Sequence, residues 1–182
     1  MLMRSFLDHK KVVQKLNICI KSSVFYTKRN KIIRNPSFPS ELSEYLVVLC
    51  YEKIFNIKLK WEIGGDLLEK NLRYEVKAFV SGPVTFSPTL NFDSIFFLDS
   101  SDLLNGYFIL YHVKCSSKKM QDFKVDKIKT FKDFELSGKR ARCQFDFLLC
   151  QFRKKKFPID FYKISVNMDN ETIKIGKLFF PM

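Results

Sequence analysis

Two stretches in the N-terminal half carry apolar residues at the spacing of an amphipathic helix. In residues 5–20 most apolar positions lie three to four residues apart along the chain: Phe6, Leu7, Val12, Val13, Leu16 and Ile20. A second helix is expected over residues 40–55, opened by Ser40, whose side chain suits an N-cap. Between the two, residues 28–39 hold four basic residues and two prolines, which predicts a basic loop or arm.

From residue 58 the pattern changes to the alternation typical of strands. In 58–63 three apolar side chains alternate with charged ones, and with a second strand over 72–80 this predicts a hairpin, followed by a loop over 81–89. A short helical or turn segment is expected at 131–135, and 140–149 alternates only in part. The remaining expected strands are 95–98, 107–113, 123–128, 162–166 and 172–180. These elements predict an α/β (α+β) fold in which a central mixed β-sheet is flanked by helices.

Length and charge narrow the picture further. With 182 residues, of which 46% are hydrophobic, the chain has the size and composition of one compact domain. Its 32 Lys and Arg against 19 Asp and Glu give a net charge of +13, which points to a polyanionic partner such as nucleic acid. A lysine bias inherited from an AT-rich genome explains the same charge. Two basic clusters suit either phosphate attraction or a solvated face: 28–34 and Arg153–Lys156.

Several classes of protein are disfavoured by what the sequence lacks. The longest apolar run, Tyr45–Tyr51, is too short to span a membrane, and charged residues interrupt the N-terminus, so we expect a cytoplasmic protein. The five cysteines show no C-x-x-C spacing, which predicts reduced and mostly buried thiols, with Cys50 packed in the core. With only two histidines, neither a paired-histidine zinc site nor an HNH nuclease is expected, and His112 is interpreted as a strand residue. No glycine-rich phosphate loop occurs.

One constellation carries hydrolytic chemistry: Asp66 after a glycine pair, then Glu75 and Lys77 in the next strand. Alternation places Glu75 and Lys77 on one face, and Asp66 ends the neighbouring strand, so the three side chains can converge. Two carboxylates beside an ammonium are costly unless a cation compensates them, and Mg2+ prefers oxygen ligands. Asp66 and Glu75 are the expected ligands, with the carbonyl of Val76 as a third. Lys77 would orient the attacking water or stabilise the transition state, and Glu44 on the preceding helix would complete the site. A solvated hairpin face is the competing interpretation.

Five segments within residues 39–98 follow one another in an order known from a nuclease family. They read P-S-E-L-S-E, G-G-D, Y-E-V-K, S-G-P-V-T-F-S-P and F-D-S-I-F-F-L, at 39–44, 64–66, 74–77, 81–88 and 92–98. In this order they resemble the PD-(D/E)xK core of small type II restriction endonucleases. The resemblance implies a restriction-endonuclease-like core, double-strand DNA cleavage, a homodimer and a role in restriction-modification. It also implies Glu44 as the helix acid, Asp66 and Glu75 as metal ligands and Lys77 as the catalytic lysine.

A second part of the resemblance lies further along the chain. Thr130–Asp133 and Gly138–Arg142 stand near the position of a G-R-R-P-R segment, with Ala141 where the family has proline. Arg140 and Arg142 are two residues apart, so on a strand they face one side and can present forks to guanine; phosphate contact is the alternative. The expected DNA-binding residues combine these basic groups with hydroxyls that follow the catalytic strand: Ser81, Thr85, Ser87, Lys139, Arg140 and Arg142.

The leading hypothesis is a sequence-specific, Mg2+-dependent endonuclease that leaves 5′-phosphate and 3′-hydroxyl ends. One active site cuts one strand, so a double-strand break requires a homodimer over a palindromic site. In this single nuclease domain, 1–38 would be a helix and basic arm, 39–115 the catalytic core, and 116–182 the DNA-recognition and C-terminal strands. Two alternatives remain: a structure-specific nuclease of the junction-resolvase or repair type, and a non-catalytic basic nucleic-acid-binding module.

Overall fold

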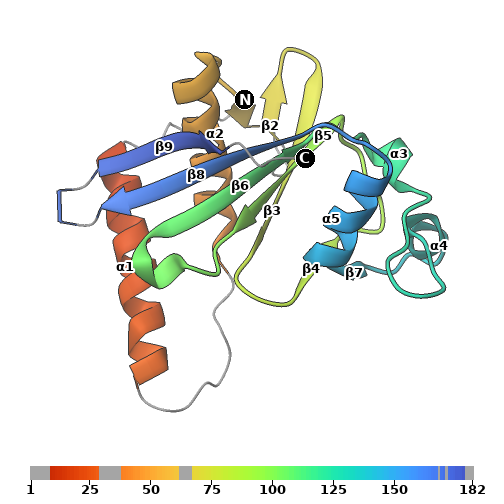
Figure 1. Ribbon diagram of the computed structural model, residues 1–182, viewed down its shortest axis with the longest axis horizontal. Coiled ribbons are helices and arrows are strands. Elements are labelled where there is room, and N and C mark those ends of the chain that lie inside the picture. The colour runs from red at the N-terminus through yellow and green to blue at the C-terminus, as the bar shows by residue number, and fades with distance from the viewer. Residues whose placement is uncertain (1–8, 29–37, 62–66, 168, 171, 179–182) are drawn as a thin grey trace.

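The computed structural model describes residues 9–28, 38–61, 67–167, 169–170 and 172–178 (Figure 1). Several predictions therefore fall outside the described residues. They are the start of the first helix, the basic arm over 29–37, the end of the strand at 58–63 together with Asp66, and the last residues of the strand at 172–180.

The centre of the molecule is a seven-stranded sheet with the order β1-β2-β3-β5-β6-β8-β9. β3 and β5 are parallel, and every other neighbouring pair is antiparallel. The strands are β1 Lys60–Trp61, β2 Leu67–Glu69, β3 Leu72–Phe79, β5 Ser94–Asp99, β6 Tyr107–Val113, β8 Ile159–Asn167 and β9 Thr172–Leu178. Two further strands, β4 Pro83–Phe86 and β7 Ala141–Gln144, pair only with each other in an antiparallel ribbon.

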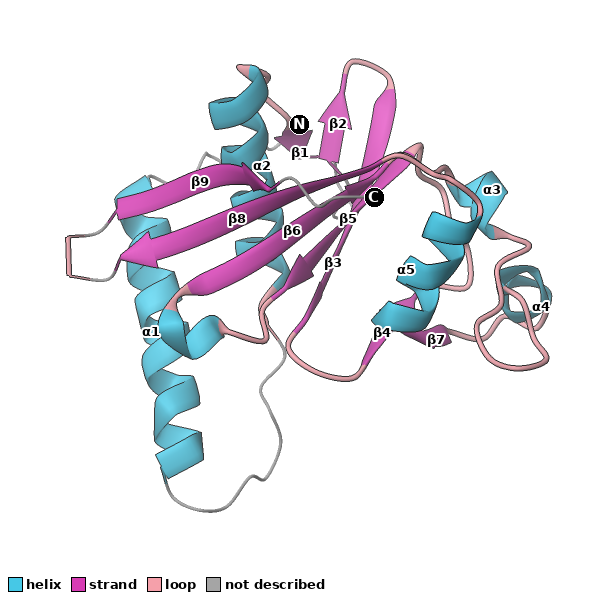
Figure 2. Cartoon of the chain, in the orientation of Figure 1, coloured by secondary structure: helices cyan, strands magenta, loops and turns pink. Residues whose placement is uncertain are grey.

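Helices cover both faces of the sheet, which confirms the predicted mixed sheet flanked by helices (Figure 2). The helices α1 His9–Lys28 and α2 Ser40–Phe55 pack on one face, and α5 Phe145–Lys154 packs on the other beside the β4–β7 ribbon. Three short elements lie in the connections: the 3-10 turn η1 Leu103–Asn105, α3 Ser117–Met120 and α4 Phe131–Leu136. No helix in the described part of the chain is both long and apolar enough to cross a membrane.

Each face of the sheet has its own hydrophobic core. The first core joins α1 and α2 to Phe96 and Leu98 of β5, and the second core joins the ribbon and α5 to Ile95 and Phe97 of the same strand. β5 is thus buried on both faces, as the continuous apolar run in its sequence predicts. Successive side chains of a strand point to opposite faces of the sheet. Alternate residues of the neighbouring β3 therefore face the first core, and the residues between them face the second.

The predicted elements at 95–98, 107–113, 131–135 and 162–166 are confirmed within one to three residues at each end. The helix expected over 40–55 also has these bounds, but its N-cap is Pro39 rather than Ser40, and Pro39 makes no side-chain capping bond. Pro39 has extended backbone angles and its carbonyl accepts from the amide of Ser43, so it fills the cap position without a side-chain acceptor.

The simple hairpin expected from the strands at 58–63 and 72–80 is wrong. A separate strand, β2, stands between them: it pairs with β1 on one side and with β3 on the other. Its three residues are too few to show an alternation of their own, and the turn at Lys70–Asn71 joins it to β3. Lys70 adopts the left-handed backbone conformation with a φ of 54°, which closes this tight turn.

Three other local predictions are corrected. The loop expected over 81–89 contains β4, and the partial alternation over 140–149 divides into β7 and the start of α5. Residues 123–128 form no strand, because the carboxylate of Asp126 accepts from the amides of Ile128 and Lys129 and turns the chain.

Candidate active site

Glu75 and Lys77 lie together on one face of β3. The Oε1 atom of Glu75 is 2.5 Å from the Nζ atom of Lys77, and each side chain is only about one-fifth exposed, at 21% and 20%. Tyr74, Val76 and Ala78 point to the opposite face and pack in or against the first core. Burial of these alternate residues fixes the register of the strand, so the acid and the amine must face the second core.

The ammonium group of Lys77 lies against an aromatic wall. Its Nζ atom is 5.8 Å from the centroid of the Phe86 ring in β4. Phe86 is fully buried, and its ring also contacts Phe97 and Phe131 in the second core. The positive charge is therefore near apolar material on one side and a carboxylate on the other, where electrostatic interactions are stronger than in bulk water.

Of the two other acids of the predicted site, only Glu44 lies among the described residues. Glu44 is buried on α2, and its Oε2 atom accepts a hydrogen bond of 3.0 Å from the indole of Trp61 in β1. Asp66 lies outside the described residues. The strand β2 begins at the following residue, Leu67, which pairs with Tyr74, the chain neighbour of Glu75. Among the described residues, no group of three or more His, Cys, Asp or Glu side chains is arranged to hold a metal ion.

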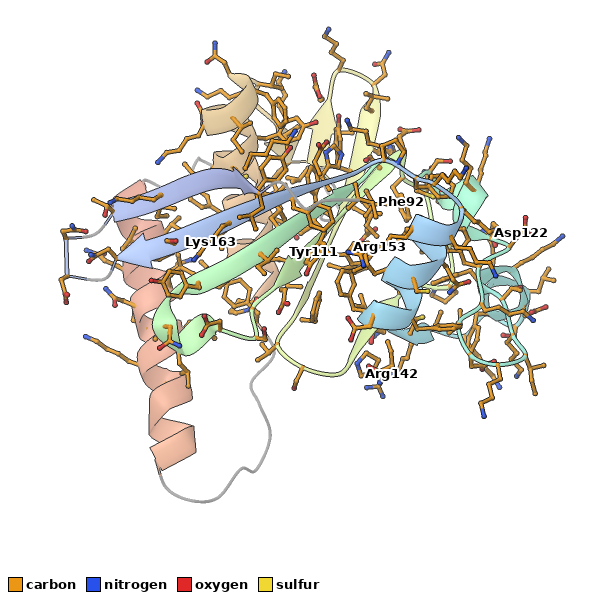
Figure 3. All side chains as sticks on the ribbon, in the orientation of Figure 1. Phe92, Tyr111, Asp122, Arg142, Arg153 and Lys163 are labelled. Carbon is orange, nitrogen blue, oxygen red and sulfur yellow. The ribbon has the colours of Figure 1, made fainter. Side chains whose placement is uncertain are left out.

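The predicted DNA-binding residues gather at the β4–β7 ribbon. Thr85 of β4 is directly opposite Arg142 of β7, and both are exposed. Lys139 and Arg140 are exposed just before β7. Ser81 and Ser87 are exposed on either side of β4, and Figure 3 shows the Arg142 side chain projecting outward from the ribbon.

His112 is a buried strand residue, as predicted. The Oγ atom of Ser94 is 2.8 Å from its Nε2 atom and donates to the carbonyl of Val113 at 2.9 Å. Burial, together with the positive charge of Lys114, lowers the pKa of His112 to about 4, although the negative charge of Asp160 opposes these effects. Ser94, His112 and Asp160 share their residue types with a hydrolase triad, but Ser94 and His112 are buried, so this cluster offers no nucleophile to a substrate.

Comparison with known proteins decides the family. The Bsp6I restriction endonuclease family model matches residues 8–148, which is more than three quarters of the chain. The chain belongs to the Bsp6I restriction endonuclease family. No curated protein and no solved structure matches it significantly.

Membership of this family makes the protein a type II restriction endonuclease with DNA as its substrate. Restriction endonucleases generally use a divalent metal ion. The family match extends from α1 into α5 and therefore contains both β3 and the β4–β7 ribbon, whereas β8 and β9 lie beyond it. The part of this restriction endonuclease that matches its family thus contains the Glu75–Lys77 pair and the exposed ribbon.

Two residues of the second resembling segment have structural roles in this family member. Thr130 and Asp133 form a capping box at the start of α4: the Asp133 amide donates to Thr130 Oγ1 at 3.4 Å, and the Thr130 amide donates to Asp133 Oδ2 at 2.7 Å. Ala141, further along the same resembling segment, is a buried ladder residue opposite Phe86. The T-x-x-D spacing is a signal from which the cap could have been predicted.

The sequence analysis missed two residues of the β4–β7 ribbon, of which Phe86 contacts the candidate site. Gln144 is exposed at the end of β7, two residues after Arg142. The partial alternation over 140–149 did not show where the strand ends and the helix begins, so this position was not recognised as an exposed strand residue. Phe86 was assigned to a loop, although the alternation in Val84, Thr85 and Phe86 is that of a half-buried strand. All five cysteines are free; Cys50, Cys115 and Cys143 are buried, as predicted for most of them.

Proposed function

We propose that this restriction endonuclease hydrolyses DNA with Mg2+ at a PD-(D/E)xK centre formed by Asp66, Glu75 and Lys77, and leaves 5′-phosphate and 3′-hydroxyl ends. The observation that supports the proposal is the close, half-buried pair of Glu75 and Lys77 on one strand. An acid and an amine separated by one residue in a strand have the spacing that the D/E-x-K motif requires. Their position in a DNA endonuclease gives this pair a substrate on which to act.

The oxygen donors of this site suit a hard divalent cation. Glu75 uses Oε1 to pair with Lys77, and within the described residues its Oε2 atom makes no hydrogen bond or ion pair. Asp66 and Glu75 would hold the ion, with the main-chain carbonyl of Val76 as a third ligand. When bound, Mg2+ would polarise the phosphoryl oxygen and favour ionisation of the attacking water.

Lys77 would stabilise the negative charge that develops on the phosphate in the transition state. The apolar wall formed by Phe86 limits solvation of its ammonium, which strengthens this interaction. Glu44, which was expected to complete the centre, is held by Trp61 on the α2 side of the sheet. Glu75 and Lys77 point to the opposite side, so the proposed centre does not include Glu44.

The surrounding surface would bind the DNA duplex. Thr85 and Arg142 on the ribbon would contact it, together with Ser81, Ser87, Lys139 and Arg140. Because one centre cuts one strand, the enzyme would act as a homodimer in the cytoplasm, within a restriction-modification system. Residues 39–115 would form its catalytic core and 116–182 its recognition and C-terminal part.

The proposal is tested by digesting unmethylated plasmid DNA with Mg2+ or with EDTA and sequencing the fragment ends. We expect discrete fragments with 5′-phosphates only when Mg2+ is present. Lys77→Ala and Asp66→Asn should each reduce the cleavage rate by about a hundredfold or more, as removal of a group that stabilises the transition state does in other enzymes.

Lys174→Ala is the control, because this exposed lysine lies on β9 at the edge of the sheet away from β3. It removes the same charge and should leave the rate within a factor of two. Discrete fragments produced at the wild-type rate by Lys77→Ala would remove the assignment of this centre.

A further inference from the structure

The β4–β7 ribbon has one buried and one exposed face. Val84 and Phe86 of β4 and Ala141 and Cys143 of β7 are each at most 2% exposed and pack in the second core. The side chains between them point outward. This arrangement fixes the ribbon to the body of the protein and leaves a rigid, two-stranded surface facing solvent.

The outward face carries a threonine, an arginine and a glutamine. Thr85 is directly opposite Arg142, and Gln144 follows Arg142 by two residues on the same face. Across the described part of the chain, the side chains of these three residues form no hydrogen bond or ion pair. Three adjacent polar side chains are therefore presented outward with their donors and acceptors unused.

Gln144 is informative because of its position. It is the N-cap residue of α5, where Ser, Thr, Asp or Asn is usual, and its side chain makes no capping bond. The helix therefore does not require this side chain, which remains directed with Arg142 along the ribbon. A neutral amide gains little from a phosphate charge but can donate to and accept from the edge of a base.

The major groove of B-DNA admits a two-stranded β-ribbon, and the chemistry of this face matches what the groove displays. An arginine fork pairs with O6 and N7 of guanine, and a glutamine amide pairs with N6 and N7 of adenine. Threonine contacts base edges through its hydroxyl and the thymine methyl through its own methyl group. Arg142 and Gln144 on one strand, two residues apart, can reach neighbouring base pairs.

The same ribbon contacts the candidate catalytic strand. Phe86, the chain neighbour of Thr85, has its ring 5.8 Å from the Nζ atom of Lys77. Phe86 points to the buried side of the ribbon, so this packed ring lies between the outward face and Lys77 and would couple a duplex held on that face to β3.

We propose that Arg142 and Gln144, supported by Thr85, read the base sequence of the cleavage site through the major groove; this inference rests on the proposed function. Arg142 discriminates a G·C pair and Gln144 an A·T pair next to it. Gln144 is thus a specificity-determining residue of this restriction endonuclease. The lysines elsewhere on the surface attract DNA without distinguishing its sequence.

The test is a binding selection from duplexes with a randomised centre, with Ca2+ in place of Mg2+, followed by cleavage of the selected site with Mg2+. The wild-type protein should select a defined site. Arg142→Ala should lose the preference at one G·C position and Gln144→Ala at one A·T position. Each should bind the wild-type site about ten- to a hundredfold more weakly. Lys174→Ala is the control and should keep the whole preference.

Both reading residues are exposed, so thermal melts of the variants should match that of the wild type. Failure of the wild type to select any site would overturn the inference, as would variants that lose affinity equally for all sequences or lose none. Selection of a defined site without cleavage in Mg2+ would instead contradict the proposed function and leave the reading role supported. The two proposals therefore fail in different ways.

Discussion

The Nζ atom of Lys77 lies 5.8 Å from the centroid of the Phe86 ring. This contact joins β3 of the central sheet to β4 of the separate ribbon, two strands that do not pair with each other. Because Phe86 is fully buried and packs against Phe97 and Phe131, its ring has little freedom to move. The position of the candidate catalytic amine is thus tied to the packing of the ribbon that carries Arg142.

Replacing the Phe86 ring with a smaller side chain should lower kcat more than it weakens DNA binding. In Phe86→Leu we expect kcat to fall by about tenfold or more, because small displacements of a catalytic group have large effects on rate. KM should change by less than about threefold. The matched control is Phe123→Leu, which is equally buried in the second core and contacts Phe152 and Phe157 instead. If both variants lose stability alike, by about 1–2 kcal/mol, and kcat falls equally in both, the contact has no special role.

The buried His112 should make the fold less stable in mild acid. Burial lowers its pKa in the folded state to about 4, below the 6.5 of the unfolded chain, so the unfolded state binds more protons between these values. Its contribution to stability is complete above pH 6.5 and decreases as the pH falls toward 4, by about 3 kcal/mol at most.

Urea denaturation of wild type and His112→Phe between pH 4 and pH 7 measures this effect. The phenylalanine should pack among the rings of Tyr51, Tyr74 and Phe96 that surround the histidine. The free energy of unfolding of the variant should depend less on pH in this range. Parallel curves for the two proteins would show that His112 is not responsible.

Gly106 has no room for a side chain. Its φ is +72°, and a Cβ atom built there would lie 2.5 Å from the carbonyl oxygen of Val166, while its own carbonyl accepts from the Val166 amide. Gly106→Ala should therefore lower the free energy of unfolding by more than about 2 kcal/mol, from the backbone conformation and the clash together. Gly138→Ala, at φ +64° with nothing within 4 Å, should show only the conformational cost of about 1 kcal/mol. Equal losses in thermal or urea unfolding would mean that the region around Val166 relaxes.

The capping box at Thr130 should have a measurable but modest effect on stability. Removing its hydroxyl in Thr130→Ala leaves the Asp133 amide without its side-chain acceptor, and we expect a loss of about 1 kcal/mol in urea unfolding. Thr130→Ser keeps the hydroxyl oxygen, so its loss of unfolding free energy should be at most about half of that in Thr130→Ala. A Thr130→Ala variant as stable as the wild type would show that α4 does not depend on its cap.

Much of the fold was predictable because the signal was local. The helix at 40–55 and the strand at 107–113 are long enough to be recognised on their own, and the strand at 95–98 was marked by a continuous apolar run. The first helix was expected to end at residue 20, but α1 continues to Lys28. β2 and β4 were missed since three or four residues carry too little pattern. The strand expected over 123–128 failed because a single carboxylate, that of Asp126, provides local bonds that compete with a ladder.

The sequence by itself determined that Glu75 and Lys77 share one face of a strand, since alternation in a β-strand depends only on chain geometry. It also determined the positive charge and the alternating order of the residues in β7. Only the tertiary structure decided that Phe86 lies against Lys77 and that Thr85 stands opposite Arg142. These contacts join segments that are far apart in the chain. Which segments meet depends on how the strands and helices pack around a common core, and the local periodicity of a sequence does not encode that packing.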